Sequence, residues 1–153
     1  MTQEEKQLLL KDLCAKLPYG VKGRIFAETT NGEFDTIGDM IFNDEPFVVV
    51  LDEINVGNGE IRVTAIEDDE TRDFIDSVQD WGDPYTIETF KPYLRPMSSM
   101  TEDEKEDYNS KFEGRDFSWE IYYGSTDWLN AHHFDYRCLI EKGLALEAPE
   151  GMY

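Results

Sequence analysis

The sequence has only two cysteines and no long hydrophobic run. Cys14 and Cys138 stand near opposite ends of the chain, form no Cys-x-x-Cys pair and lack the spacing of metal ligands. The apolar run at residues 8–10 is three residues long and flanked by charges, so it does not resemble a signal peptide. No stretch approaches the roughly 20 apolar residues that a membrane span requires. We therefore expect a cytoplasmic protein that does not contact a membrane, with both cysteines packed as small hydrophobic residues.

Basic residues are scarce in the middle of the chain. The 153 residues include 14 Lys and Arg against 34 Asp and Glu, a formal net charge of −20. Between residues 28 and 90 only Arg62 and Arg72 are basic, whereas more than half of all acidic residues fall there. A surface of this charge repels nucleic acid and attracts basic proteins, so we expect a basic protein partner and no direct nucleic-acid binding. The expected contact residues are Asp44, Glu45, Asp52, Glu53, Glu67, Asp68, Asp69 and Glu70.

The first element is predicted to be an amphipathic helix over residues 2–17. Thr2 and Glu5 have the spacing of a capping box, in which each side chain bonds the other residue's backbone N–H. Pro18 and Gly20 then end the helix. The residues that recur at helical spacing, and that we expect to face the core, are Leu9, Leu10, Leu13, Cys14 and Leu17.

Alternating and β-branched stretches follow in an acidic β region over residues 21–90. The pattern predicts strands near residues 21–28, 34–42, 47–51, 61–66 and 85–87. Asn31-Gly32 and residues 57–59 provide the turns. Residues 67–83 show no clear pattern. We expect about five strands in a small antiparallel sheet that curls into a partly open, SH3-like barrel.

A helical region is predicted at residues 98–143. Thr101 and Glu104 form a second capping box, in competition with one at Ser99, before a helix that ends near residue 112. Residues 117–123 are predicted to be strand-like, and Ser125 or Thr126 to cap a further helix. Asp135 is expected to cap a short helix over residues 136–142 that Gly143 ends. The whole chain, residues 1–153, is thus predicted to be one α+β domain.

The only two histidines, His132 and His133, are adjacent in the stretch DWLNAHHFDYR. Neighbouring residues of a helix point about 100° apart, so this pair cannot share a metal as an i, i+4 pair does. Trp128 and Leu129 precede them by four residues. We therefore expect one imidazole to rest on such a neighbour and the other to face water, with no metal or cofactor bound.

A polar site at His133, Asp135 and Arg137 is kept as an alternative. Within it, His133 and Asp135 could bind zinc together with a carboxylate from elsewhere, since zinc accepts mixed nitrogen and oxygen ligands. Other chemistries lack their motifs. The chain has no Gly-x-Ser-x-Gly elbow and no EF-hand loop, and its Gly57-Asn-Gly59 turn is too short for a dinucleotide site. An enzyme that uses carboxylates or this polar site is therefore an alternative to a binding protein.

Two segments are distinctive: KPYLRPMSSMTEDE at residues 91–104 and DWLNAHHFDYRCLIEKGLALEAPEGMY at residues 127–153. They resemble a family of short proteins without an assigned activity, encoded in gut Bacteroides genomes and their phages or other mobile elements. The resemblance implies a genomic setting and assigns no catalytic residue. We expect a non-enzymatic protein-binding module. A nucleic-acid mimic that occupies the basic groove of a DNA- or RNA-binding protein is an alternative that suits a phage.

Overall fold

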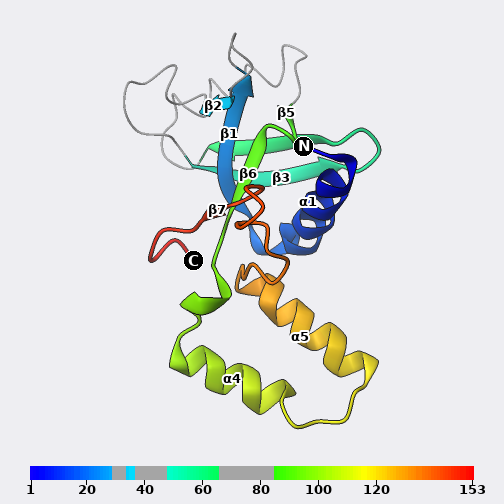
Figure 1. Ribbon diagram of the computed structural model, residues 1–153, viewed down its shortest axis with the longest axis vertical. Coiled ribbons are helices and arrows are strands. Elements are labelled where there is room, and N and C mark those ends of the chain that lie inside the picture. Colours follow the sequence, from blue (N-terminus) through cyan, green and yellow to red (C-terminus); the bar gives the residue numbers. More distant parts are fainter. Residues whose placement is uncertain (29–33, 37–47, 66–84) are drawn as a thin grey trace.

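The computed structural model describes residues 1–28, 34–36, 48–65 and 85–153. Helix α1, Gln3–Lys16, begins the chain and lies against the sheet (Figure 1). The predicted capping box is present: the Glu5 N–H donates to the Thr2 hydroxyl at 3.2 Å, and the Thr2 N–H donates to the Glu5 carboxylate at 2.7 Å. A 3-10 turn, Leu17–Tyr19, ends the helix, and Gly20 reverses the chain with a positive φ of 75°.

The described strands form one sheet in the order β5-β4-β3-β1-β6-β7, with β2 also paired to β1. The strands are β1 Lys22–Glu28, β2 Phe34–Thr36, β3 Val49–Asn55, β4 Glu60–Ala65, β5 Tyr85–Thr86, β6 Phe90–Leu94 and β7 Leu146–Glu147. All pairs are antiparallel except β6 with β7, which is parallel. The α+β class is confirmed, but the sheet is mixed because the carboxy-terminal segment returns beside β6. The SH3-like barrel stays a prediction, and residues 29–33, 37–47 and 66–84 lie outside the description.

The central strand β1 fits against β6 because one position lacks a side chain. A Cβ at Gly23 would lie 2.4 Å from the Phe90 ring and 2.6 Å from the Lys91 carbonyl oxygen. The predicted turn at residues 57–59 joins β3 to β4, and Gly59 takes a positive φ of 76° there. Both glycines therefore serve the close strand pairing that positions the rest of the fold.

A hydrophobic core fills the space between α1 and the sheet. Leu9 and Leu13 of α1 are fully buried in it, and Leu139 and Leu144 of the carboxy-terminal segment join from the other end of the chain. The buried residues of the strands, with Val21 and Ile87 next to strand ends, complete this cluster: Val21, Ile25, Val49, Leu51, Ile61, Val63, Tyr85, Ile87, Phe90 and Leu94. The core thus ties the two termini to one sheet.

Two further helices form an arm at one end of the molecule (Figure 1). Helix α4, Glu102–Phe112, begins with the predicted Thr101–Glu104 capping box rather than with its Ser99 competitor. Helix α5, Trp119–Ala131, begins where a strand was predicted, so that prediction is wrong. The Ser118 hydroxyl accepts the Ile121 N–H and caps α5. Ser125 and Thr126 consequently lie inside the helix.

The predicted helix over residues 136–142 is also wrong, because the chain forms turns there. Cys138 adopts a positive φ of 59°, which interrupts any helix that starts at residue 136. The last turn does close at Gly143 as predicted: its N–H donates to Ile140, and the Leu144 N–H donates to Leu139 at 2.9 Å. These bonds have the pattern of a Schellman motif.

Both cysteines are exposed, so the prediction that they are packed inside is wrong. The buried face of α1 consists of Leu9, Asp12, Leu13 and Lys16, which leaves Cys14 on the solvent side. Among the described residues, no helix is long and apolar enough to cross a membrane.

Candidate functional site

The two histidines form the end of α5. His132 is the last capping residue, and His133 adopts a positive φ of 58° immediately after it. The His133 N–H donates to Asn130, and the Phe134 N–H donates to Leu129, both at 3.0 Å. This is a Schellman motif in which histidine occupies the position usually held by glycine. The pair of rare residues therefore marks a helix terminus.

Each imidazole stacks on a different aromatic ring. The His132 ring lies on Trp128 with centroids 3.8 Å apart, as predicted for one of the two. The other prediction is wrong, because His133 is buried and stacks at 3.7 Å on Tyr153, near the end of the chain. Burial lowers the pKa of His133 to about 4, while a hydrogen bond to the Tyr19 backbone opposes this shift. His133 is thus neutral at pH 7, and its stacking on Tyr153 holds the carboxy terminus against the end of α5.

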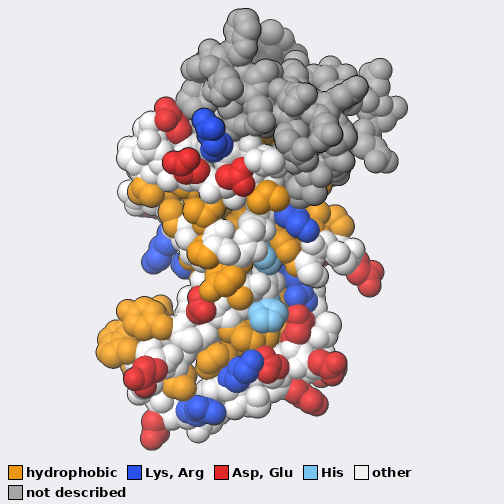
Figure 2. Space-filling model, turned by 180° about the vertical axis from the view of Figure 1, so that it is seen from behind, with side chains coloured by type: hydrophobic (Ala, Val, Ile, Leu, Met, Phe, Trp, Pro, Cys, Tyr) orange, Lys and Arg blue, Asp and Glu red, His pale blue; other side chains and the backbone are white. Residues whose placement is uncertain are grey.

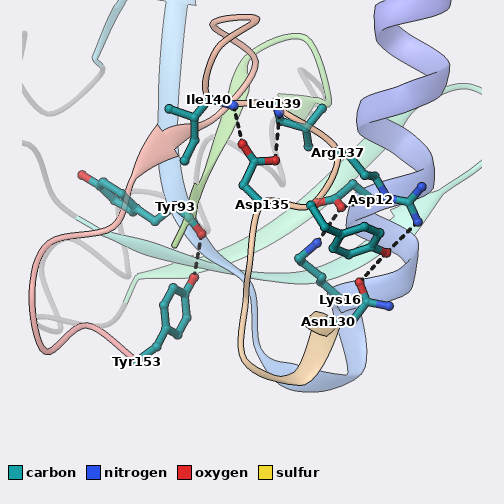
Figure 3. A network of polar contacts seen from close by, with 10 residues as sticks. Asp12, Lys16, Tyr93, Asn130, Asp135, Arg137, Leu139, Ile140 and Tyr153 are labelled. Atoms are coloured by element: carbon teal, nitrogen blue, oxygen red, sulfur yellow. Dashed lines mark hydrogen bonds and ion pairs between the residues drawn. The ribbon is translucent and has the colours of Figure 1, made fainter. Parts of the chain in front are cut away.

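Asp135 caps a turn, as its predicted role required, although no helix follows. Its two carboxylate oxygens accept the N–H groups of Leu139 and Ile140, each at 2.8 Å (Figure 3). A buried carboxylate with two backbone donors is well satisfied. Asp135 therefore fixes the path of the segment that carries Leu139 into the core.

Arg137 joins a polar network at the junction of α1 and α5 (Figure 3). Its Nε donates to Asp12 at 3.1 Å, and its terminal nitrogen donates to the Tyr136 hydroxyl at 2.8 Å. Tyr136 in turn donates to Asn130 of α5 at 2.9 Å. On α1, the Lys16 ammonium lies 2.5 Å from the same Asp12 carboxylate, and both side chains are 0% exposed. Hydrophobic spacing does not predict this ion pair, because it places only the apolar residues of the helix against the core.

Burial dominates the protonation of the Asp12–Lys16 pair. Removal from water raises the pKa of Asp12 and lowers the pKa of Lys16, and the attraction between the two opposes both shifts. Asp12 Oδ2 has no hydrogen-bond partner among the described residues, so the carboxylate accepts hydrogen bonds from Lys16 and Arg137 through Oδ1. A buried pair of this kind adds little net stability over well-packed apolar residues, but removing one partner alone is costly.

The structure does not assemble the predicted polar site into a reactive centre. His133 stacks on Tyr153, Asp135 accepts hydrogen bonds from two backbone amides, and Arg137 donates to Asp12. Within the described part of the chain, no group of three or more His, Cys, Asp or Glu side chains is placed to hold a metal ion. The geometry of these three residues accordingly supports a role in joining α1, α5 and the carboxy terminus.

Of the predicted acidic contact residues, the structure describes two. Asp52 is the extra residue of a β-bulge in β3 and accepts a hydrogen bond from the Thr64 hydroxyl. Glu53 lies opposite Arg62 of β4, and both acidic side chains are exposed. Asp44, Glu45 and residues 67–70 lie outside the described residues. The described sheet therefore presents carboxylates to solvent at this point.

The most unusual surface of the described structure is a group of exposed aromatic rings at the start of α5, which we call the aromatic cluster. Its members and their exposed fractions are Phe117 73%, Trp119 66%, Tyr122 50% and Tyr123 64%. Trp119 contacts each of the other three rings, at centroid distances of 5.7 to 6.2 Å. Figure 2 shows hydrophobic side chains that project together from the helical end of the molecule.

The second half of α5, in contrast, is packed. Trp128 contacts Tyr108 of α4 edge-to-face at 5.2 Å, and its indole N–H donates to Asp107 at 2.9 Å. Gly124 lets the helices approach, since a Cβ there would lie 3.2 Å from the Phe112 ring. Because this half fixes the helix, the aromatic cluster is held on a rigid element.

A shallow hollow borders the aromatic cluster, between α1 and α5. Its volume is about 500 Å³, and it is lined by Ala15, Tyr123, Gly124, Thr126, Asp127 and Asn130. Asp127 accepts a hydrogen bond from the Tyr19 hydroxyl at 2.5 Å, which holds its carboxylate in place. No lysine or arginine is among these lining residues, so the local charge is negative.

The sequence pattern does not indicate that the aromatic cluster is exposed. Phe, Trp and Tyr at residues 117–123 favour a strand, and the segment was accordingly predicted to be strand-like. The sequence signal for a helix here is Ser118, which caps a helix that runs through Trp128. The comparisons with known proteins add no candidate function: neither the protein-family models, the curated proteins nor the solved structures contain a match to this chain.

Proposed function

We propose that this chain is a non-enzymatic protein-binding module, and that the aromatic cluster on α5 is the centre of its contact surface. The observation that carries the proposal is the exposure of Trp119 and of the three aromatic rings that contact it, at the start of a helix whose second half packs against α4. Rings of this size leave on the order of 500 Å² of apolar surface in water, which is the size of the largest apolar patch on a typical monomer, and such patches are often functional. Trp and Tyr are also the residues most enriched at the centres of protein interfaces.

The charge of the chain favours a basic protein as the occupant. Two copies would each bring a net charge of −20 to the interface, so self-association is opposed by repulsion. Exposed carboxylates adjoin the aromatic cluster at Asp116, Glu120 and Asp127. A basic partner gains from both features, because the rings provide buried area and the acidic residues speed association. The acidic residues of the β region extend the same attraction.

The proposal includes the setting that the resemblance implies, a phage or other mobile element, and a cytoplasmic location. It also keeps the partly open, SH3-like barrel as the expected form of the β region. A nucleic-acid mimic is the second candidate, supported by the exposed carboxylates of Asp52 and Glu53. A mimic binds through carboxylates and does not require the aromatic cluster.

The proposal is tested by affinity capture from a lysate of the native host with wild-type protein, Trp119→Ser and Val56→Ser. Val56 is the matched control, because it is 62% exposed and lies on the β3–β4 turn, away from α5. We expect a basic protein to be retained by wild type and Val56→Ser and to be lost with Trp119→Ser. Its retention should also fall as salt rises.

Two outcomes would contradict the proposal. A partner that Trp119→Ser retains in full does not use the aromatic cluster, and dependence on Asp52 and Glu53 instead would favour the mimic. A wild-type protein that sediments as a dimer, and becomes a monomer with Trp119→Ser, would identify a second copy as the occupant. Trp119→Ser should change the free energy of unfolding by less than about 0.5 kcal/mol, as expected for an exposed site.

A further inference from the structure

Two acidic residues flank Tyr123 on α5. Glu120 precedes it by three residues and Asp127 follows it by four, so the helix places all three on one face. All three side chains are exposed. A cation that lies on the Tyr123 ring therefore has a carboxylate one helical turn away in either direction.

The hollow beside Tyr123 provides room for such a cation. It has a volume of about 500 Å³ and contains both the Tyr123 ring and Asp127 in its lining. The Tyr19 hydroxyl, 2.5 Å from Asp127, orders this carboxylate before any ligand arrives. Ordering in advance lowers the entropic cost of binding.

The protein already holds two of its own arginines between a ring and a carboxylate. Arg95 lies over the Phe134 ring at 4.4 Å and donates to Glu104 at 2.7 and 2.8 Å. Arg137 lies 4.7 Å from the centre of the Tyr136 ring and donates to Asp12 at 3.1 Å. Tyr123 and Asp127 offer the same two groups at the surface without an arginine in the lining of the hollow.

We propose, on the basis of the proposed function, that this face of α5 recognises an arginine side chain of the partner, stacked on Tyr123 and bonded to Asp127. A guanidinium is planar, so it covers an aromatic face while its N–H groups reach a carboxylate in two parallel bonds. A lysine ammonium cannot form that pair of bonds. A nucleic-acid base could stack on the same ring, but its phosphates would meet Glu120 and Asp127, which repel them.

The test is an NMR titration of the full-length protein with a capped tetra-arginine peptide, with capped tetralysine and tetraglutamate peptides for comparison. We expect tetra-arginine to move the amide signals of residues 119–127 to saturation, and to bind more tightly than tetralysine. Tyr123→Ser and Asp127→Asn should each weaken tetra-arginine binding by roughly two- to five-fold, the size of one exposed cation–π contact or ion pair.

Two matched variants separate local recognition from general charge. Glu141→Gln removes one exposed carboxylate away from α5 and should leave the affinity unchanged. Tyr19→Phe removes the hydrogen bond to Asp127 but keeps its charge, and should weaken binding less than Asp127→Asn does. Equal effects of Glu141→Gln and Asp127→Asn would overturn the proposal, as would equal affinity for tetralysine. An oligodeoxythymidine that moves the same signals would also overturn it.

The outcomes distinguish this proposal from the proposed function. If a host protein is captured through Trp119 but tetra-arginine does not bind at residues 119–127, the arginine site alone is wrong. If no captured protein depends on Trp119, the proposed function is wrong whatever the peptide does.

Discussion

The buried ion pair of α1 makes an unusual prediction: removing Asp12 alone is worse than removing both Asp12 and Lys16. Asp12→Leu leaves the Lys16 ammonium 0% exposed and without its counter-ion. Leaving one member of a buried pair alone costs about 3–5 kcal/mol. Loss of its proton limits this cost, since neutralising an ordinary lysine at pH 7 requires about 5 kcal/mol. Burial already lowers the pKa of Lys16, which makes that neutralisation easier.

The other single change should cost less, because Asp12 has a second partner. Lys16→Met leaves the carboxylate with the Arg137 Nε at 3.1 Å, so we expect a loss of about 2 kcal/mol, the value of one charged hydrogen bond. In the double variant Asp12→Leu/Lys16→Met, Arg137 keeps its bond to Tyr136 and is 16% exposed to water. The double variant should therefore be more stable than Asp12→Leu alone, with a coupling of about 2–3 kcal/mol.

Urea unfolding at pH 7, followed by tryptophan fluorescence, measures these four free energies. The control cycle uses the exposed Glu102–Lys105 pair of α4, whose side chains are 85% and 47% exposed. Exposed pairs contribute about 0–1 kcal/mol, so its single changes should be small and additive. If the Asp12 and Lys16 changes add to within about 0.5 kcal/mol, the two groups are not coupled and the reasoning is wrong.

Two further predictions concern pH and strand packing. The pKa of His133 is about 6.5 in the unfolded protein and about 4 in the folded protein, so protonation favours unfolding as the pH falls between these values. From pH 7 to pH 4, the free energy of unfolding of the wild type should therefore fall by about 3 kcal/mol relative to that of His133→Asn. Equal pH profiles in urea titrations would contradict this. Gly23→Ala places a Cβ 2.4 Å from the Phe90 ring and 2.6 Å from the Lys91 carbonyl oxygen. It should therefore destabilise the protein by about 1–3 kcal/mol or more. An unchanged urea midpoint would show that β1 and β6 separate easily.

Local signals were sufficient for much of the fold. The capping boxes at Thr2 and Thr101, the turn at residues 57–59 and the closing turn at Gly143 all follow from bonds between residues a few positions apart. Such interactions are visible in the sequence because both partners lie in the same short segment.

Long-range contacts account for what the sequence could not predict. Hydrophobic spacing placed Cys14 on the buried face of α1, whereas the helix turns Asp12 and Lys16 inward, where Asp12 accepts a hydrogen bond from Arg137, more than 120 positions away. The parallel pairing of β7 with β6 likewise depends on where the carboxy terminus returns. Neither feature has a local signal.

The candidate site was missed for a related reason. Aromatic residues favour strands and cores, so Phe117, Trp119 and Tyr123 were expected in a strand. Their exposure depends on which half of α5 packs against α4, and Trp128 takes that place.

The central claim is that the aromatic cluster contacts a basic protein, and site-specific photo-cross-linking tests it most directly. Phe117 is 73% exposed and can be replaced by p-benzoylphenylalanine with little change in shape, while the same residue at Val56 is the control. After irradiation in the native host, we predict one major adduct with a basic protein at position 117 and none at position 56. Equal adducts at the two positions, or none at position 117, would contradict the account.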